Sequence, residues 1–191
     1  MENGTLAMHK HLMKIAAFFL IPIAALAFSA AAEPQLIVLV RHAERATEPA
    51  GDPALSEAGI QRAEALATAL EHVGITAIIT SNFRRTRETA QPLAKQLGLT
   101  PISVAIRKGD VAAHIQDVVA AVRSLSGRVL VVGHSNTIAA IVQALGGPAM
   151  PELCETSFSH VFVMAPKSNA APALLRLHYG DGNAPAAPDC Q

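Results

Sequence analysis

The stretch "QLIVLVRHAER", Gln35 to Arg45, decides the fold prediction. Its apolar run, residues 36–40, is typical of a strand buried on both faces of a sheet. The run passes directly into the ionisable pair Arg41 and His42, with no turn residues between. A second apolar run, 129–132 in "GRVLVVGHSN", passes in the same way into Gly133 and His134. Two buried strands that each end at a histidine predict one site that contains both rings.

The rest of the chain alternates strand-like and helix-like segments. We expect strands at 35–40, 75–80, 101–106 and 129–132 and two final strands within 158–166 and 173–179; we expect helices at 56–74, 84–98, 110–125 and 137–147. Ser56 is a good N-cap, and Pro92 is expected to bend or interrupt its helix. This order predicts an α/β fold, a three-layer sandwich with a mostly parallel central sheet and helices on both faces.

In such sheets, ligands bind outside the carboxyl ends of the strands. His42 and His134 are therefore expected to converge at one crevice. Ser81, just after the second strand, and Arg85, on the first turn of the next helix, can join them.

Composition narrows the class of function. The 191 residues are 51% hydrophobic, with 15 basic and 15 acidic side chains, so one compact domain is expected. A formal net charge of zero, the lack of a Lys/Arg-rich run and the absence of Trp argue against nucleic acid as a partner. We expect no cofactor and no metal, because arginines can supply the charge stabilisation that a metal would give.

The N-terminal segment resembles an export signal. Lys10 and Lys14 precede the apolar run "IAAFFLIPIAALAFSAAA", which ends in small residues. We expect residues 1–32 to be a signal peptide and 33–191 a single domain, periplasmic or secreted, with no membrane span after cleavage. An uncleaved membrane anchor is the alternative. In an oxidising compartment Cys154 and Cys190 could form a disulfide, and a buried thiol with a free chain end is the alternative.

The residues at the predicted crevice suit a phosphoryl group. Guanidinium groups bind tetrahedral oxyanions through paired hydrogen bonds, and the helix that begins after His134 adds backbone N–H donors. A neutral imidazole is a nucleophile, and nearby guanidinium charges lower its pKa. A second histidine, if protonated, can stabilise charge on the transferred group.

Four blocks, "VLVRHAER", "DPALSEAGIQRAEAL", "SNFRRTRETAQPLA" and "VLVVGHSNT", resemble in order those of the histidine phosphatase superfamily, the phosphoglycerate mutase-like proteins. The resemblance runs from about Leu36 to Ala165. It implies that His42 is the nucleophile that becomes phosphohistidine. It also implies phosphate binding by Arg41, by Arg85 rather than its neighbour Arg84, by His134, and by the backbone at Ser135 and Asn136.

Two features depart from the family pattern or stay open. Ala43 replaces a glycine that is common in the family and should be tolerated if its φ is negative. The resemblance implies a general acid between the second arginine and the second histidine. Asp110 is the favoured candidate, although it is also a good N-cap; the others are Glu88, Asp117 and, more weakly, His114.

The short interval between Arg85 and His134 leaves no room for a large cap domain, which favours hydrolysis over a mutase reaction. We therefore expect a phosphatase that hydrolyses phosphomonoesters of small molecules or glycans. The alternatives are a phosphatase of lipopolysaccharide core heptose phosphate, a phosphohistidine or phosphoprotein phosphatase, and a non-catalytic phosphate-ligand binder. Specificity would come from loops such as 46–54, 107–110 and 146–156.

Overall fold

The computed structural model describes Met1 and residues 33–107 and 109–182. The predicted signal peptide, apart from Met1, and Cys190 lie outside the described residues. Signal cleavage and a bond between Cys154 and Cys190 therefore stay predictions. Within the described part, no helix is long and apolar enough to cross a membrane.

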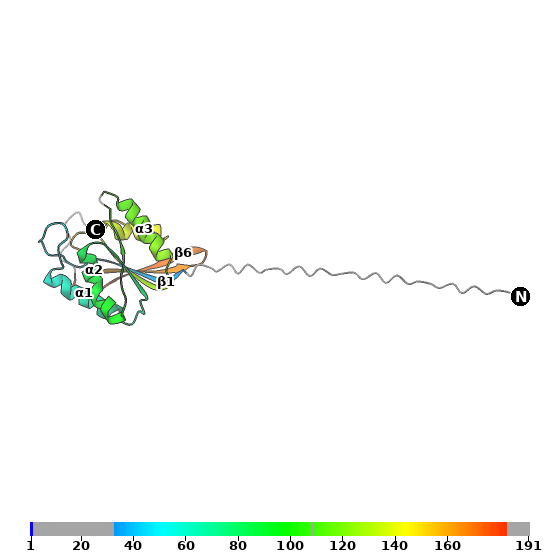
Figure 1. Ribbon diagram of the computed structural model, residues 1–191. Coiled ribbons are helices and arrows are strands. Elements are labelled where there is room, and N and C mark those ends of the chain that lie inside the picture. The colour runs from blue at the N-terminus through cyan, green and yellow to red at the C-terminus, as the bar shows by residue number, and fades with distance from the viewer. Residues whose placement is uncertain (2–32, 108, 183–191) are drawn as a thin grey trace. The chain divides into compact units, whose positions relative to one another are not determined.

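In the described part of the chain, six strands form one sheet in the order β3-β2-β4-β1-β5-β6. Figure 1 labels β1 and β6 of this sheet. The strands are β1 (Pro34–Arg41), β2 (Ala77–Ser81), β3 (Ile102–Val104), β4 (Gly127–Gly133), β5 (His160–Lys167) and β6 (Ala170–His178). The first four in this order are parallel to one another, whereas β5 is antiparallel to both β1 and β6. The mostly parallel sheet is confirmed, with an antiparallel hairpin at one edge. This hairpin turns tightly at Asn169, which adopts a positive φ of 62°.

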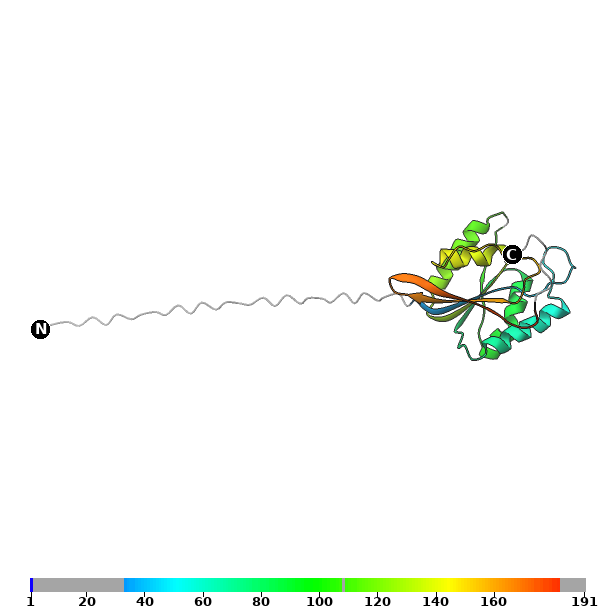
Figure 2. The same cartoon turned by 180° about the vertical axis from the view of Figure 1, so that it is seen from behind.

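Among the described residues, four helices cover the sheet, two on each face (Figure 2). They are α1 (Glu57–Leu70), α2 (Arg84–Leu97), α3 (Val111–Arg123) and α4 (Ser135–Ala144). Side chains alternate along β1, so that Val38 and Val40 pack against α1 and α2, whereas Ile37 and Leu39 face α3 and α4. This alternation gives two hydrophobic cores, and the three-layer sandwich is confirmed.

Several expected boundaries differ from those observed. Helix α1 is capped by the Ser56 side chain, as predicted, but ends at Leu70 and not near Gly74. Pro92 lies inside α2 without interrupting it, and the helix ends at Gly98, which has a positive φ of 65°. Strand β3 covers only three residues and is an exposed edge strand with one neighbour.

The parallel strands place the predicted residues together at the carboxyl ends of the strands. In the register of β1 and β4, Arg41 lies opposite Gly133, so the residues that follow each strand are neighbours. Strand β2, on the other side of β4, ends at Ser81. The carboxyl ends of β1, β2 and β4 therefore meet where the sequence predicted a crevice.

Candidate active site

His42 is held as a neutral ring with one specific nitrogen available. Its Nδ1 lies 2.8 Å from the carbonyl oxygen of Ala43. Because a carbonyl oxygen only accepts, Nδ1 carries the proton and Nε2 keeps its lone pair. Burial, together with the charges of Arg41 and Arg85, lowers the pKa of His42 to about 3. The ring is therefore neutral near pH 7, as a nucleophile must be.

His134 faces His42 across the site, with ring centroids 5.3 Å apart. Its Nδ1 lies 3.4 Å from Nη2 of Arg85, and its Nε2 lies 2.9 Å from Oγ of Ser81. Arginine can only donate, so Nδ1 is the acceptor and Nε2–H donates to the serine. Burial, with the nearby His42 and Arg85, lowers the pKa of His134 to about 2, so this ring is also neutral in the free protein.

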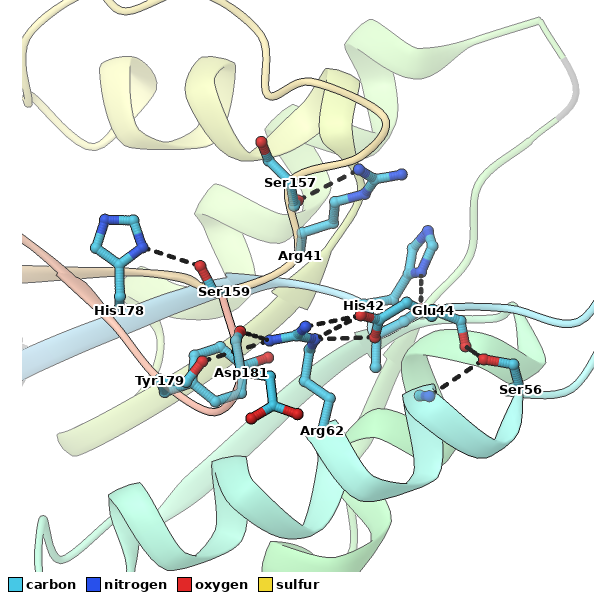
Figure 3. Close-up of polar contacts among 12 residues, drawn as sticks. Arg41, His42, Glu44, Ser56, Arg62, Ser157, Ser159, His178, Tyr179 and Asp181 are labelled. Carbon is cyan, nitrogen blue, oxygen red and sulfur yellow. Dashed lines mark hydrogen bonds and ion pairs between the residues drawn. The ribbon is translucent and has the colours of Figure 1, made fainter. Parts of the chain in front are cut away.

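Arg41 is buried, and its guanidinium is fixed by the loop that precedes β5. Nη1 donates to the carbonyl oxygens of Cys154 and Ser157, at 2.6 and 3.3 Å. The guanidinium also stacks on Phe158, 4.3 Å from the ring centroid, and Figure 3 shows Arg41 directed toward Ser157. These contacts hold the guanidinium beside His42 in one orientation.

Two buried guanidinium N–H groups are left without a partner. Within residues 33–107 and 109–182, Nε of Arg41 and Nε of Arg85 have no hydrogen-bond acceptor. A buried donor without an acceptor is costly, especially when it is charged. An anionic ligand with several oxygens, such as a phosphoryl group, would supply the acceptors.

A cavity of about 590 Å³ lies over these residues and receives the start of α4. Its lining includes His42, Arg85 and His134, with Ser135, Asn136 and Arg45 around them. Ser135 is the first residue of α4, where the backbone N–H groups have no partner within the helix. The predicted binding residues therefore lie together, apart from Arg41, which lines the neighbouring hollow with Glu44 and Phe158.

Residues 37–109 match the family model described as "Histidine phosphatase superfamily (branch 1)". GpmB of Yersinia pestis, which is named a probable phosphoglycerate mutase, is 37% identical over an alignment of 73 residues that covers 35% of this chain. The match spans 34%, about a third, of the length of that curated relative. The resemblance to the histidine phosphatase superfamily is confirmed.

Solved structures extend the likeness beyond the matched segment. The protein histidine phosphatase SixA, solved with tungstate, aligns with a TM-score of 0.59 at 18% identity, covering 75% of this chain and 96% of SixA. A mycobacterial glucosyl-3-phosphoglycerate phosphatase aligns with a TM-score of 0.54 at 18% identity, covering 76% and 98%. At these identities the likeness shows the histidine phosphatase fold. His134 lies beyond residue 109, and its place in the site rests on the geometry above.

Three of the proposed acid residues are exposed or engaged elsewhere, whereas His114 is buried and lies close enough to His134 to lower the pKa of that ring. Asp110 is exposed and caps α3 by accepting a hydrogen bond from the Ala113 N–H at 3.0 Å. Glu88 accepts from the Leu55 N–H at 2.8 Å and pairs with Arg84. Asp117 is exposed on α3. Neither Asp110, Glu88 nor Asp117 lines the large cavity.

Glu155 is a site residue that the sequence did not single out. Its Oε2 lies 2.5 Å from Nη2 of Arg41, and its Oε1 accepts a hydrogen bond from Oγ of Ser135. It belongs to the loop 146–156, which was expected to affect specificity. An acidic residue in an aperiodic loop gives no positional signal, so only the path of the folded loop reveals its role.

The two residues after Ala43 have different environments. Glu44 forms an ion pair with Arg62 of α1, whose guanidinium also donates to the backbone oxygens of Tyr179 and Asp181 (Figure 3). Arg45 is exposed and lines the cavity. Ala43 itself is buried with a negative φ and donates its N–H to Thr89, so alanine is accommodated where glycine is common.

Proposed function

We propose that the protein is a phosphatase that hydrolyses phosphomonoesters through a phosphohistidine intermediate on Nε2 of His42. One observation carries the proposal: His42 is neutral, its Nδ1–H is held by the Ala43 carbonyl, and its Nε2 is available between Arg41, Arg85 and His134. This is the state an imidazole nucleophile needs beside cations that bind a phosphoryl group.

The chemistry has two steps. Nε2 attacks phosphorus, the P–O bond to the alcohol breaks, and the alcohol leaves with a proton from an acid. Water then attacks the phosphohistidine, releases inorganic phosphate and restores Nε2. Arg41, Arg85 and the N-terminus of α4 stabilise the negative charge of the phosphoryl oxygens in both steps. His134, aligned by Ser81 and Arg85, lies beside the same oxygens.

The short segment between α2 and β4 favours hydrolysis over a mutase reaction. In the described part of the chain, this segment holds only β3 and α3. A mutase must keep its phosphoryl group away from water until transfer. The two reactions are separable with labelled substrate: a hydrolase sends the label to inorganic phosphate, whereas a mutase sends it to an acceptor alcohol.

The mechanism is tested by quenching enzyme incubated with ³²P-labelled substrate in either acid or alkali. Phosphohistidine survives alkali and is lost in acid, so alkali-stable label is expected. His42→Ala should form no adduct and should lose nearly all turnover. Acid-stable label, or substantial turnover in His42→Ala, would contradict the mechanism. Anion binding without adduct or turnover on any substrate would indicate the non-catalytic binder.

For substrate, we propose a phosphorylated small molecule or glycan outside the inner membrane. Heptose phosphates of the lipopolysaccharide core belong to this class. A second candidate is a phosphorylated protein side chain, because the residues described between α2 and β4 form no inserted domain over the cavity. A panel of sugar phosphates, glycan phosphates and a phosphohistidine peptide would rank these by kcat/KM. N-terminal sequencing of the exported protein would test cleavage after Ala32.

A further inference from the structure

The carboxylate of Glu155 contacts two of the groups that would bind a phosphoryl anion. One oxygen pairs with the guanidinium of Arg41, and the other accepts from the hydroxyl of Ser135 at the start of α4. The Arg41 side chain is 3% exposed, whereas that of Glu155 is 74% exposed. The arginine is therefore the fixed partner, and the glutamate is free to move toward solvent.

The charges around Glu155 come from several elements. Those that line the same two hollows, or interact with Glu155, are Arg41, His42, Glu44, Arg45, Arg85, His134 and Glu152. Burial acts to raise the pKa of Glu155, but the hydrogen bond from Ser135 and the charge of Arg41 outweigh it and leave the pKa below its usual value. The carboxylate is thus ionised in the free protein at neutral pH.

A bound phosphoryl group changes this balance. Its oxygens need the donors that Glu155 now uses, and a second anion beside a carboxylate raises the pKa of that carboxyl group. A carboxylate that stays ionised would oppose binding by like-charge repulsion. Uptake of one proton removes the repulsion and converts the carboxylate into a hydrogen-bond donor.

We propose that Glu155 takes up a proton when the phosphoryl group binds and delivers it to the leaving alcohol oxygen. The inference rests on the proposed function. As the P–O bond breaks, its electron pair stays on oxygen, which takes the proton of Glu155, and Nε2 of His42 gains the phosphoryl group. The ionised Glu155 then accepts a proton from the water that attacks the phosphohistidine, and the cycle closes.

Glu155 is better placed for this role than the other carboxyl groups. Asp110 accepts a hydrogen bond at the start of α3 and does not line the cavity. Glu152 lines the cavity, but the described part of the structure gives it no hydrogen bond to Arg41 or Ser135. Glu152→Gln therefore removes the same charge from the same loop without removing the contact, and it serves as the matched control.

Binding is tested with inorganic sulfate, which carries no titrating proton between pH 6 and 8.5. Calorimetry in two buffers of different ionisation enthalpy should show proton uptake by the wild type, with affinity falling as pH rises. Glu155→Gln should bind sulfate about tenfold more tightly at pH 8 and lose most of this pH dependence. Glu152→Gln should keep it. Equal pH dependence in wild type and Glu155→Gln overturns the proposal.

Catalysis is tested with two leaving groups. Glu155→Gln should release p-nitrophenolate from p-nitrophenyl phosphate in the first turnover nearly as fast as the wild type, because that phenolate leaves without a proton. It should lose about 10²- to 10⁴-fold in kcat on an alkyl phosphate. Thermal unfolding of each variant confirms that it is folded. A selective loss in Asp110→Asn and none in Glu155→Gln would overturn the assignment in favour of Asp110.

Failure of the proposed function gives a different result. Wild-type protein that binds sulfate but hydrolyses neither ester would reject phosphatase activity and the donor role together. Active wild type with an equally active Glu155→Gln on both esters would reject the donor role alone.

Discussion

The backbone N–H of His42 donates to the carbonyl oxygen of Gly133 at 2.9 Å. This hydrogen bond joins the two histidine-bearing loops directly beyond the ends of β1 and β4. The position of the His42 ring is therefore set by the backbone that carries His134. A substitution at Gly133 should displace both rings.

Gly133→Ala tests this connection. A Cβ at Gly133 would lie 2.8 Å from Cδ1 of Ile138 and 3.0 Å from Oγ1 of Thr137, the atom that accepts from the His134 N–H. We expect the free energy of unfolding to fall by about 1–3 kcal/mol. We expect kcat to fall by a larger fraction of its wild-type value than the free energy of unfolding does. Urea unfolding and steady-state kinetics measure both. Gly182→Ala, where the added methyl group meets nothing within 4 Å, is the control.

Arg41→Lys should weaken anion binding. Lysine cannot reproduce the contacts of the guanidinium with the carbonyl oxygens of Cys154 and Ser157 and its stacking on Phe158. We expect vanadate affinity to fall at least about tenfold, as measured by calorimetry. The exposed Arg45, replaced by lysine, should change affinity less than about threefold. Unchanged vanadate affinity in Arg41→Lys would contradict this, because it would show that the positive charge alone is sufficient.

Glu44→Gln should destabilise the domain more than it impairs binding. The Arg62 side chain is 6% exposed, and the variant removes the charge that compensates it. We expect the free energy of unfolding to fall by about 1–3 kcal/mol, since Glu44 is itself only partly buried. Glu64→Gln, on the exposed face of α1, should change it by less than about 0.5 kcal/mol. Chemical denaturation of the two variants decides the point.

Stability should decrease as the pH falls below 6.5. Burial lowers the pKa of His42 to about 3, of His134 to about 2 and of His160 to about 4. Unfolded histidine, with a pKa near 6.5, binds a proton that these folded rings do not bind. The stabilisation is therefore complete above pH 6.5 and is lost progressively as the pH falls toward each folded pKa.

The measurement is the free energy of unfolding at pH 7 and pH 5, with His42→Asn compared with wild type. Removing one of the contributing rings should reduce the difference between the two pH values by up to about 1.4 kcal/mol per pH unit of the window. His72→Asn, at an exposed histidine, should leave the difference as in the wild type. If the free energy of unfolding fell more between pH 7 and pH 5 in His42→Asn than in wild type, the neutral, buried state of that ring would be contradicted.

Dialysis against a chelator should leave kcat unchanged, because the guanidinium groups of Arg41 and Arg85 supply positive charge at the proposed phosphoryl site. Turnover after treatment with EDTA, followed by addition of divalent cations one at a time, measures this. Activity that is lost and then restored by one cation would contradict it.

The strand ends explain how much of the site was predictable. The runs before His42 and His134 are long, apolar and bounded by helical patterns, so their burial and parallel pairing follow from local sequence. Because the two strands are parallel, their carboxyl ends lie at the same end of the sheet. The N-caps Ser56 and Asp110 were predictable from residue type and position.

The contribution of Glu155 was not predictable in this way. It depends on β5 lying antiparallel beside β1, which carries the preceding loop across the end of β1 and onto Arg41. No local pattern in residues 146–156 specifies that path. The ion pair between Glu44 and Arg62 was not predictable for a similar reason. Arg62 lies on α1, whose amphipathic pattern does not indicate which residue its guanidinium contacts.

The direction of β1 has a practical consequence. Strand β1 begins at Pro34 and ends at Arg41. Pro34 therefore lies at the opposite end of the strand from His42. Eight residues of extended strand separate the two by roughly 25 Å. A purification tag or a surface linker fused ahead of Pro34 would thus be attached far from the cavity. Immobilised protein should keep the cavity open to large ligands.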